Sequence, residues 1–237
     1  MNTAEKLIEV AENTPKVHEA GKKWAYENPK TPTDGRMWMC EWYAGLNRAK
    51  GFIWDQYYDG ERGEYINPEE DESTHMENIE YPKGTQNAEN FAEAISTRRW
   101  NDETLCDEMI AVPTKKFTGF LDMTSATDAS YMFGYGEPPA TDAGTIVFSN
   151  HECNYTRAFD AMTSLKKLKA QGSIKSTISF RYSPLDRESI TSIVNALDTE
   201  AAGETCTFKK TAKEAAFTDD EWETLIATKT NWEILLK

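Results

Sequence analysis

The chain of 237 residues is 39% hydrophobic and carries seven Trp, ten Tyr and ten Phe, enough to build a sizeable core and too many for a wholly disordered chain. Its 40 acidic and 26 basic side chains give a formal net charge of −14, which argues against nucleic acid or an anionic membrane as the main partner. No run of about 18 apolar residues occurs, so we expect no membrane insertion.

Residues 1–27 are predicted to be a helical segment for docking or oligomerisation. Asn2 can cap a helix, Leu7 and Ile8 lie on one face, and Pro15 interrupts the pattern. The apolar stripe is narrow, so it needs a partner, either the body of the chain or the same helix in other subunits. The acidic start lacks the basic and then apolar stretch of a signal peptide, so we expect synthesis in the cytoplasm without one.

Residues 28–100 form a predicted aromatic-rich region with an acidic surface loop. The aromatic cluster is either a compact core or a surface that contacts sugar or protein. On the second interpretation the candidate binding residues are Trp38, Trp42, Trp54 and Tyr57. The acidic stretch at 68–74 could ligate a divalent cation, but it lacks the ordered spacing and central Gly of a calcium loop, which favours a solvated loop.

Residues 101–237 alternate short β-favouring stretches with polar turns and helical patches, which predicts strand-plus-helix units. Phe133 and Phe159 are 26 positions apart, and Phe180, Phe208 and Ile234 follow at steps of 28 and 26. These steps fall within the repeat length of leucine-rich repeats. The fold class predicted for this part is therefore α/β, a short solenoid that resembles leucine-rich repeats and ends in a cap; a compact α/β domain with coincidental spacing is the alternative.

Two helices are predicted within this part. In residues 183–198, Ser183 and Asp186 form a potential capping box with Pro184 at the first helical position, followed by an apolar face. In residues 217–231, Thr218 and Glu221 form a second capping box. The buried faces predicted for the two helices contain Ile190, Ile193, Val194 and Leu197 in the first and Trp222, Leu225 and Ile226 in the second.

The residues give little support for catalysis. The only close His and Cys are His151 and Cys153, in a predicted loop without a third group to orient them. The phosphate-binding, dinucleotide-binding, zinc-protease and nucleophile-elbow motifs are absent from the sequence. We therefore expect no enzymatic activity, cofactor or metal. The remaining cysteines, Cys40, Cys106 and Cys206, are scattered like Cys153 and are expected to be buried and reduced.

Four further aromatic residues are candidates for a binding surface. Tyr131, Tyr135, Tyr155 and Tyr182 lie near predicted strands or turns and, if exposed, could stack on the sugars of a cell envelope. Core or interface positions are the alternative for each of them. Repeat proteins use one extended face for binding, which is why these positions are of interest.

Three stretches carry a resemblance to a known family: "NTAEKLIEVAENTPKVHEAGKK", "RRWNDETLCDEMIAVPTKKFTGFLDMTSATDASYMF", and the run from "TSLKKLKAQGSI" through "DRESITSIVNALDTEAAGETCTF" to "NWEILL". They resemble the leader, first repeat and closing repeats of BspA-like leucine-rich-repeat proteins, in the divergent form found in phage and prophage structural genes of gut Firmicutes. The resemblance covers roughly residues 1–24 and 98–237. The region between departs from the pattern, with more Trp.

The resemblance implies a non-enzymatic protein associated with a virion, located in a tail, baseplate or appendage. We expect self-association, with a trimer as the first hypothesis, contacts with other virion proteins, and possible attachment to a bacterial surface glycan or protein. The alternative is a phage-encoded effector that binds and inhibits a host protein, which the high acidity would also suit.

Overall fold

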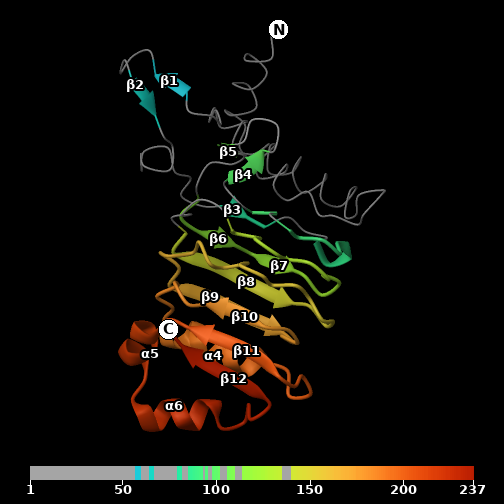
Figure 1. Ribbon diagram of the computed structural model, residues 1–237, viewed down its shortest axis with the longest axis vertical. Helices are drawn as coiled ribbons and strands as arrows, with labels where there is room; N and C mark the ends of the chain where they lie inside the picture. The colour runs from blue at the N-terminus through green and yellow to red at the C-terminus, as the bar shows by residue number, and fades with distance from the viewer. Residues whose placement is uncertain are drawn as a thin grey trace.

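The computed structural model describes residues 57–59, 64–66, 79–81, 85–92, 94–95, 98–101, 106–109, 114–134 and 140–237. The helical segment predicted at 1–27 and the candidate residues Trp38, Trp42, Trp54 and Tyr135 lie outside these ranges. The described part contains both helices and parallel strands, an α/β arrangement stacked along one axis (Figure 1).

The elements follow one another in this order. They are β1 Tyr57–Asp59, β2 Glu64–Ile66, β3 Ile79–Glu80, the 3-10 turn η2 Thr85–Asn87, β4 Arg98–Asn101, β5 Cys106–Met109, β6 Phe117–Thr118, β7 Phe120–Asp122, β8 Asp142–Phe148, β9 Lys167–Gly172, β10 Ile178–Phe180, α4 Arg187–Ala196, β11 Glu204–Phe208, α5 Lys210–Ala216, α6 Asp219–Ile226 and β12 Trp232–Leu236.

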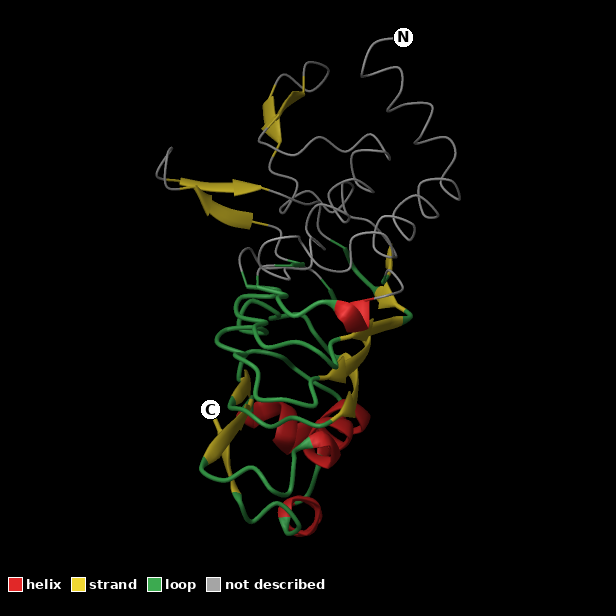
Figure 2. Ribbon diagram, turned by 90° about the vertical axis from the view of Figure 1, so that its right-hand side faces the viewer, coloured by secondary structure: helices red, strands yellow, loops and turns green. Residues whose placement is uncertain are grey.

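One side of the stack carries the parallel sheet β7–β8–β9. Leu121 is in register with Ile146, and Ile146 with Ala170. All three are buried, because alternate side chains of a strand point to the same face. The other side carries β10–β11–β12, also parallel. Figure 2 shows the strands on these two opposite sides, with the sheet next to the C-terminus on the left.

The register corrects one predicted step. Phe180 pairs with Phe208, as the 28-residue spacing predicted, but Phe208 pairs with Leu236. Ile234 pairs instead with Cys206, so the prediction that it follows Phe208 is wrong by two residues. The step is 28 in both pairs of this sheet, β10 with β11 and β11 with β12.

A column of phenylalanine rings runs through the core. The ring centroids of Phe133 and Phe159 are 5.5 Å apart, those of Phe159 and Phe180 4.7 Å, and those of Phe180 and Phe208 6.1 Å. All four rings are at most 1% exposed. The distances are those of favourable aromatic pairs, so each layer of the stack is joined to the next by a buried ring contact.

Helix α4 begins later than the sequence predicted. Asp186 is its N-cap and accepts a hydrogen bond from the backbone N–H of Ser189, so Ser183 and Pro184 lie before the helix. The hydroxyl of Ser183 is buried and donates to the carbonyl of Met162, which removes it from any cap. The predicted apolar face is confirmed, since Ile190, Ile193, Val194 and Leu197 are all buried.

Helix α6 has the predicted capping box. The Thr218 side chain accepts from the backbone N–H of Glu221, and the Glu221 carboxylate accepts from the backbone N–H of Thr218. Trp222 is buried, and Leu225 and Ile226 pack partly buried against the core. Both halves of the box satisfy N–H groups that the first helical turn leaves without partners.

Helix α4 takes the place of a further strand beside β9. The backbone N–H of Leu168 donates to the hydroxyl of Ser189, and that of Ala170 to the hydroxyl of Ser192, both at 3.0 Å. The same hydroxyls donate to the carbonyls of Lys166 and Leu168. Two serines one helical turn apart therefore satisfy the edge of the sheet β7–β8–β9.

Candidate functional site

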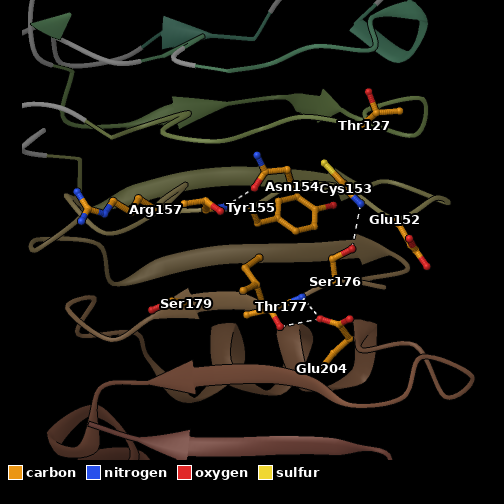
Figure 3. Close-up of a pocket in the computed structure, with 12 residues that line it drawn as sticks. Thr127, Glu152, Cys153, Asn154, Tyr155, Arg157, Ser176, Thr177, Ser179 and Glu204 are labelled. Carbon is orange, nitrogen blue, oxygen red and sulfur yellow. Dashed lines mark hydrogen bonds between the residues drawn. The ribbon is translucent and has the colours of Figure 1, made fainter. Parts of the chain in front are cut away.

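An open groove of about 510 Å³ lies on the described surface between two successive crossings of the stack by the chain. We call these crossings rungs: rung 154–158 forms one wall and rung 176–180 the other. Figure 3 shows the two walls facing one another. The lining residues are Thr127, Glu152, Cys153, Asn154, Tyr155, Thr156, Arg157, Ser176, Thr177, Ile178, Ser179 and Glu204.

The first wall is shaped by a turn that recurs in the described part of the chain, for example at Asn90, whose side chain accepts from the backbone N–H of Ala92. Asp128 accepts from the backbone N–H of Ser130 at 2.9 Å, and Asn154, 26 positions later, accepts from that of Thr156 at 3.1 Å. Such Asx turns are intrinsic to Asp and Asn, whose short side chains reach the backbone two residues on. The two residues pair by a parallel bridge, and the Asn154 amide donates to the Asp128 carboxylate.

The turns at Asp128 and Asn154 each end in a residue of left-handed backbone conformation. Tyr131 has φ of 53° and Arg157 of 54°, values that are uncommon for residues other than Gly, Asn and Asp. The Arg157 guanidinium lies over the Tyr131 ring at 5.7 Å from its centroid. Arg157 lines the groove, and its contact with the Tyr131 ring helps to hold the guanidinium in place.

Backbone-to-backbone hydrogen bonds join rung 154–158 to the segment before it, 128–132, but none is found between rung 154–158 and rung 176–180. Ala129 and Tyr131 donate their backbone N–H groups to the carbonyls of Asn154 and Thr156, both at 2.9 Å. The matching residues one turn later are Tyr155 and Arg157, and their backbone N–H groups have no protein acceptor among the described residues. By the same geometry these two donors point toward rung 176–180, into the groove.

The length of the chain between the rungs changes at the same point. Phe159 and Phe180 are 21 positions apart, whereas the neighbouring steps along the phenylalanine column are 26 and 28. Their ring centroids nevertheless lie 4.7 Å apart, with the ring planes tilted by 35°. The shorter connection therefore keeps the core contact while the backbones of the two rungs are left without the bonds that join the preceding pair.

The second wall is held by side chains. The Ser176 hydroxyl accepts from the backbone N–H of Cys153 at 3.0 Å. The backbone N–H and the hydroxyl of Thr177 both donate to the Glu204 carboxylate at 2.6 Å. These bonds fix the wall and orient one carboxylate toward the groove.

The floor of the groove contains two groups that do not ionise near neutral pH. Burial raises the pKa of the Cys153 thiol to about 12, and burial likewise raises the pKa of Tyr155 above its usual value. A thiol reacts as its thiolate, so Cys153 is a poor nucleophile here. His151 is exposed while Cys153 and Cys206 are buried and free.

The aromatic residues that were predicted to bind a ligand differ in burial and position in the structure. Tyr155 is only 3% exposed, so the prediction of an exposed ring is wrong for it and the core alternative holds, although it lines the groove. Tyr131 is half-buried under the Arg157 guanidinium and does not line the groove, and Tyr182 is 45% exposed with Arg181 over its ring. Tyr57 lies in β1, away from these segments in the chain.

Sequence reasoning missed the polar residues of the groove: Asn154, Arg157, Thr177 and Glu204. A signal was present, since "DASYMF" and "NYTRAF" share the order Asx, any residue, Ser or Thr, and a final Phe at a spacing of 26. The break between the rungs has no such signal, because it depends on how the next unit packs.

A second groove, of about 490 Å³, lies where β8 and β9 meet α4. Its lining includes Asp142, Lys167, Lys169, Asp186 and Glu188. Positive and negative side chains alternate there, and Ser189 and Ser192 on its floor already bond to β9. We assign it a structural role in joining the helix to the sheet.

No family model, curated protein or solved structure matches the chain. Within the described segments, no group of three or more His, Cys, Asp or Glu side chains is placed to hold a metal ion. Among the helices described, none is both long enough and apolar enough to cross a membrane.

Proposed function

We propose that the chain is a non-enzymatic binding protein of a phage or prophage particle, built on a short leucine-rich-repeat-like solenoid. The observation that carries the proposal is the stacking of successive layers, joined by the phenylalanine column and by parallel strands, whose steps are 24 to 25 residues in β7–β8–β9 and 28 in β10–β11–β12. Units that bury their apolar faces against their neighbours are typical of solenoids, and such folds serve mainly to present an extended surface.

The chemistry of the groove supports binding over catalysis. Its polar groups are hydroxyls, an amide, two carboxylates and one guanidinium, and its thiol and phenol are held neutral by burial. The setting in a phage tail, baseplate or appendage comes from the family resemblance of residues 1–24 and 98–237. Self-association, with a trimer as the first hypothesis, belongs to the same proposal.

The proposal is tested by the protein content of purified particles. We expect mass spectrometry of gradient-purified particles to find the chain at stoichiometric level, and sedimentation of the purified chain to show a defined homo-oligomer. A strictly monomeric chain that is absent from particles contradicts the proposal. Capture of one stoichiometric cytosolic host protein from lysate would favour the effector alternative instead.

A further inference from the structure

We propose that the groove between rungs 154–158 and 176–180 binds an N-acetylated sugar of a surface glycan. The inference rests on the proposed binding role and names its ligand class. The first observation is the pair of backbone N–H donors of Tyr155 and Arg157, which have no protein acceptor in the described part of the chain. With the Arg157 guanidinium they form a cluster of donors in an open groove that fits an acceptor such as the carbonyl oxygen of an acetamido group.

An extended peptide fits the same wall poorly. A strand that adds to an edge needs acceptors as well as donors from that edge. The carbonyls of Tyr155 and Arg157 already accept from the backbone N–H groups of Ala158 at 3.0 Å and Asp160 at 3.4 Å. The wall therefore offers a peptide strand N–H donors without the carbonyl acceptors that strand pairing also needs. A single carbonyl group on a sugar needs only the donors.

The remaining lining suits hydroxyl groups. One oxygen of the Glu204 carboxylate accepts both bonds from Thr177, which leaves the other oxygen to accept from a ligand. Glu152 is exposed on the groove rim. Thr156 and Ser179 add hydroxyls that donate or accept, as sugar hydroxyls do.

The negative charge of the lining and of the whole chain favours an uncharged ligand over an anion at this site. The titratable acids of the lining are Glu152 and Glu204, against one cation, Arg157, and the whole chain has a net charge of −14. A phosphate or a polyanion would therefore be repelled on approach. An uncharged sugar is not, and Arg157, held over the Tyr131 ring, lines the groove that it would enter.

The test uses the full-length chain and the N-acetylglucosamine tetramer as probe, followed by backbone NMR and calorimetry. We expect the tetramer to shift the amide resonances of Tyr155, Arg157 and Thr177, and the uncharged glucose tetramer, in which a hydroxyl replaces each acetamido group, to bind at least tenfold more weakly because it lacks the carbonyl acceptor. No binding of the tetramer by the folded chain, or equal binding of both tetramers, overturns the inference. Binding of an extended peptide at these amides in place of the tetramer also overturns it.

Arg157→Gly is the informative variant. Glycine adopts the φ of 54° at this position without strain, so the fold is retained while the guanidinium is lost. We expect tetramer affinity to fall roughly tenfold or more, and Thr156→Trp, which fills the groove from an exposed position, to abolish binding. Lys166→Ala removes one exposed cation outside the groove and should leave affinity unchanged. Unchanged affinity in Arg157→Gly contradicts the assignment.

Failure of this inference is distinct from failure of the proposed function. A chain that is present in particles but ignores the tetramer loses the ligand assignment and keeps its virion role. A chain that binds the tetramer through Arg157 but is absent from particles keeps the ligand assignment and loses the virion role.

Discussion

The two serines of α4 that cap the edge of β9 provide the sharpest energetic test of the fold. In Ser189→Ala the buried N–H of Leu168 loses its acceptor, which costs about 1–3 kcal/mol. The gain in helix propensity from Ser to Ala returns about 0.5 kcal/mol. We therefore expect Ser189→Ala to lower the free energy of unfolding by about 0.5–2.5 kcal/mol, and Ser192→Ala by somewhat less, because its bond to Ala170 is only partly buried.

The matched control is Thr191→Ala on the same helix. The Thr191 hydroxyl donates to the carbonyl of Arg187 within the helix and makes no bond to β9, so its loss should change stability by less than about 0.5 kcal/mol. Urea unfolding followed by circular dichroism gives the free energies, and hydrogen exchange at the Leu168 and Ala170 amides gives the local effect. If Ser189→Ala and Ser192→Ala cost no more than Thr191→Ala, the edge-capping interpretation is refuted.

Two further predictions concern backbone geometry and pH. A Cβ on Gly172, where φ is 77°, would lie 2.5 Å from the Phe148 carbonyl oxygen, whereas one on Gly203, with φ of 78°, meets nothing within 4 Å. We expect Gly203→Ala to cost about 1–2 kcal/mol of unfolding free energy from the left-handed conformation alone, and Gly172→Ala to cost at least about 1 kcal/mol more; equal costs in urea titrations would show that the close approach is unimportant. The hydrogen bond from Arg187 lowers the pKa of Glu221 to about 2 from 4.5, so its contribution to stability is complete above pH 4.5 and is lost as the pH falls toward 2. The melting temperature should therefore fall over that window less steeply in Glu221→Gln than in the wild-type chain, and parallel profiles would contradict the assignment.

The features that the sequence predicted correctly depend on short or regular spacings between residues. The capping box of Thr218 and Glu221 was readable because both partners lie within one helical turn. The pairing of Phe180 with Phe208 followed from their spacing and their burial in equivalent strands. The face of α4 was readable from its 3.6-residue period.

Other features depended on contacts between distant segments. Ser183 resembled a cap from its neighbours, but its hydroxyl is used by the carbonyl of Met162, 21 residues earlier. Ile234 has the right character to follow Phe208, yet the register is set by the whole of β12 and places Leu236 there. The groove arises from an interrupted set of bonds between rungs, which no local pattern encodes.

The most direct test of the proposed binding role is co-sedimentation of the purified full-length chain with isolated envelopes of the host bacterium. The account predicts saturable retention by envelopes, competed by the N-acetylglucosamine tetramer and weakened in Arg157→Gly. Absence of saturable retention by envelopes, or capture by the cytosolic fraction alone, would contradict the binding role, and equal retention of the wild-type chain and Arg157→Gly would overturn the ligand assignment.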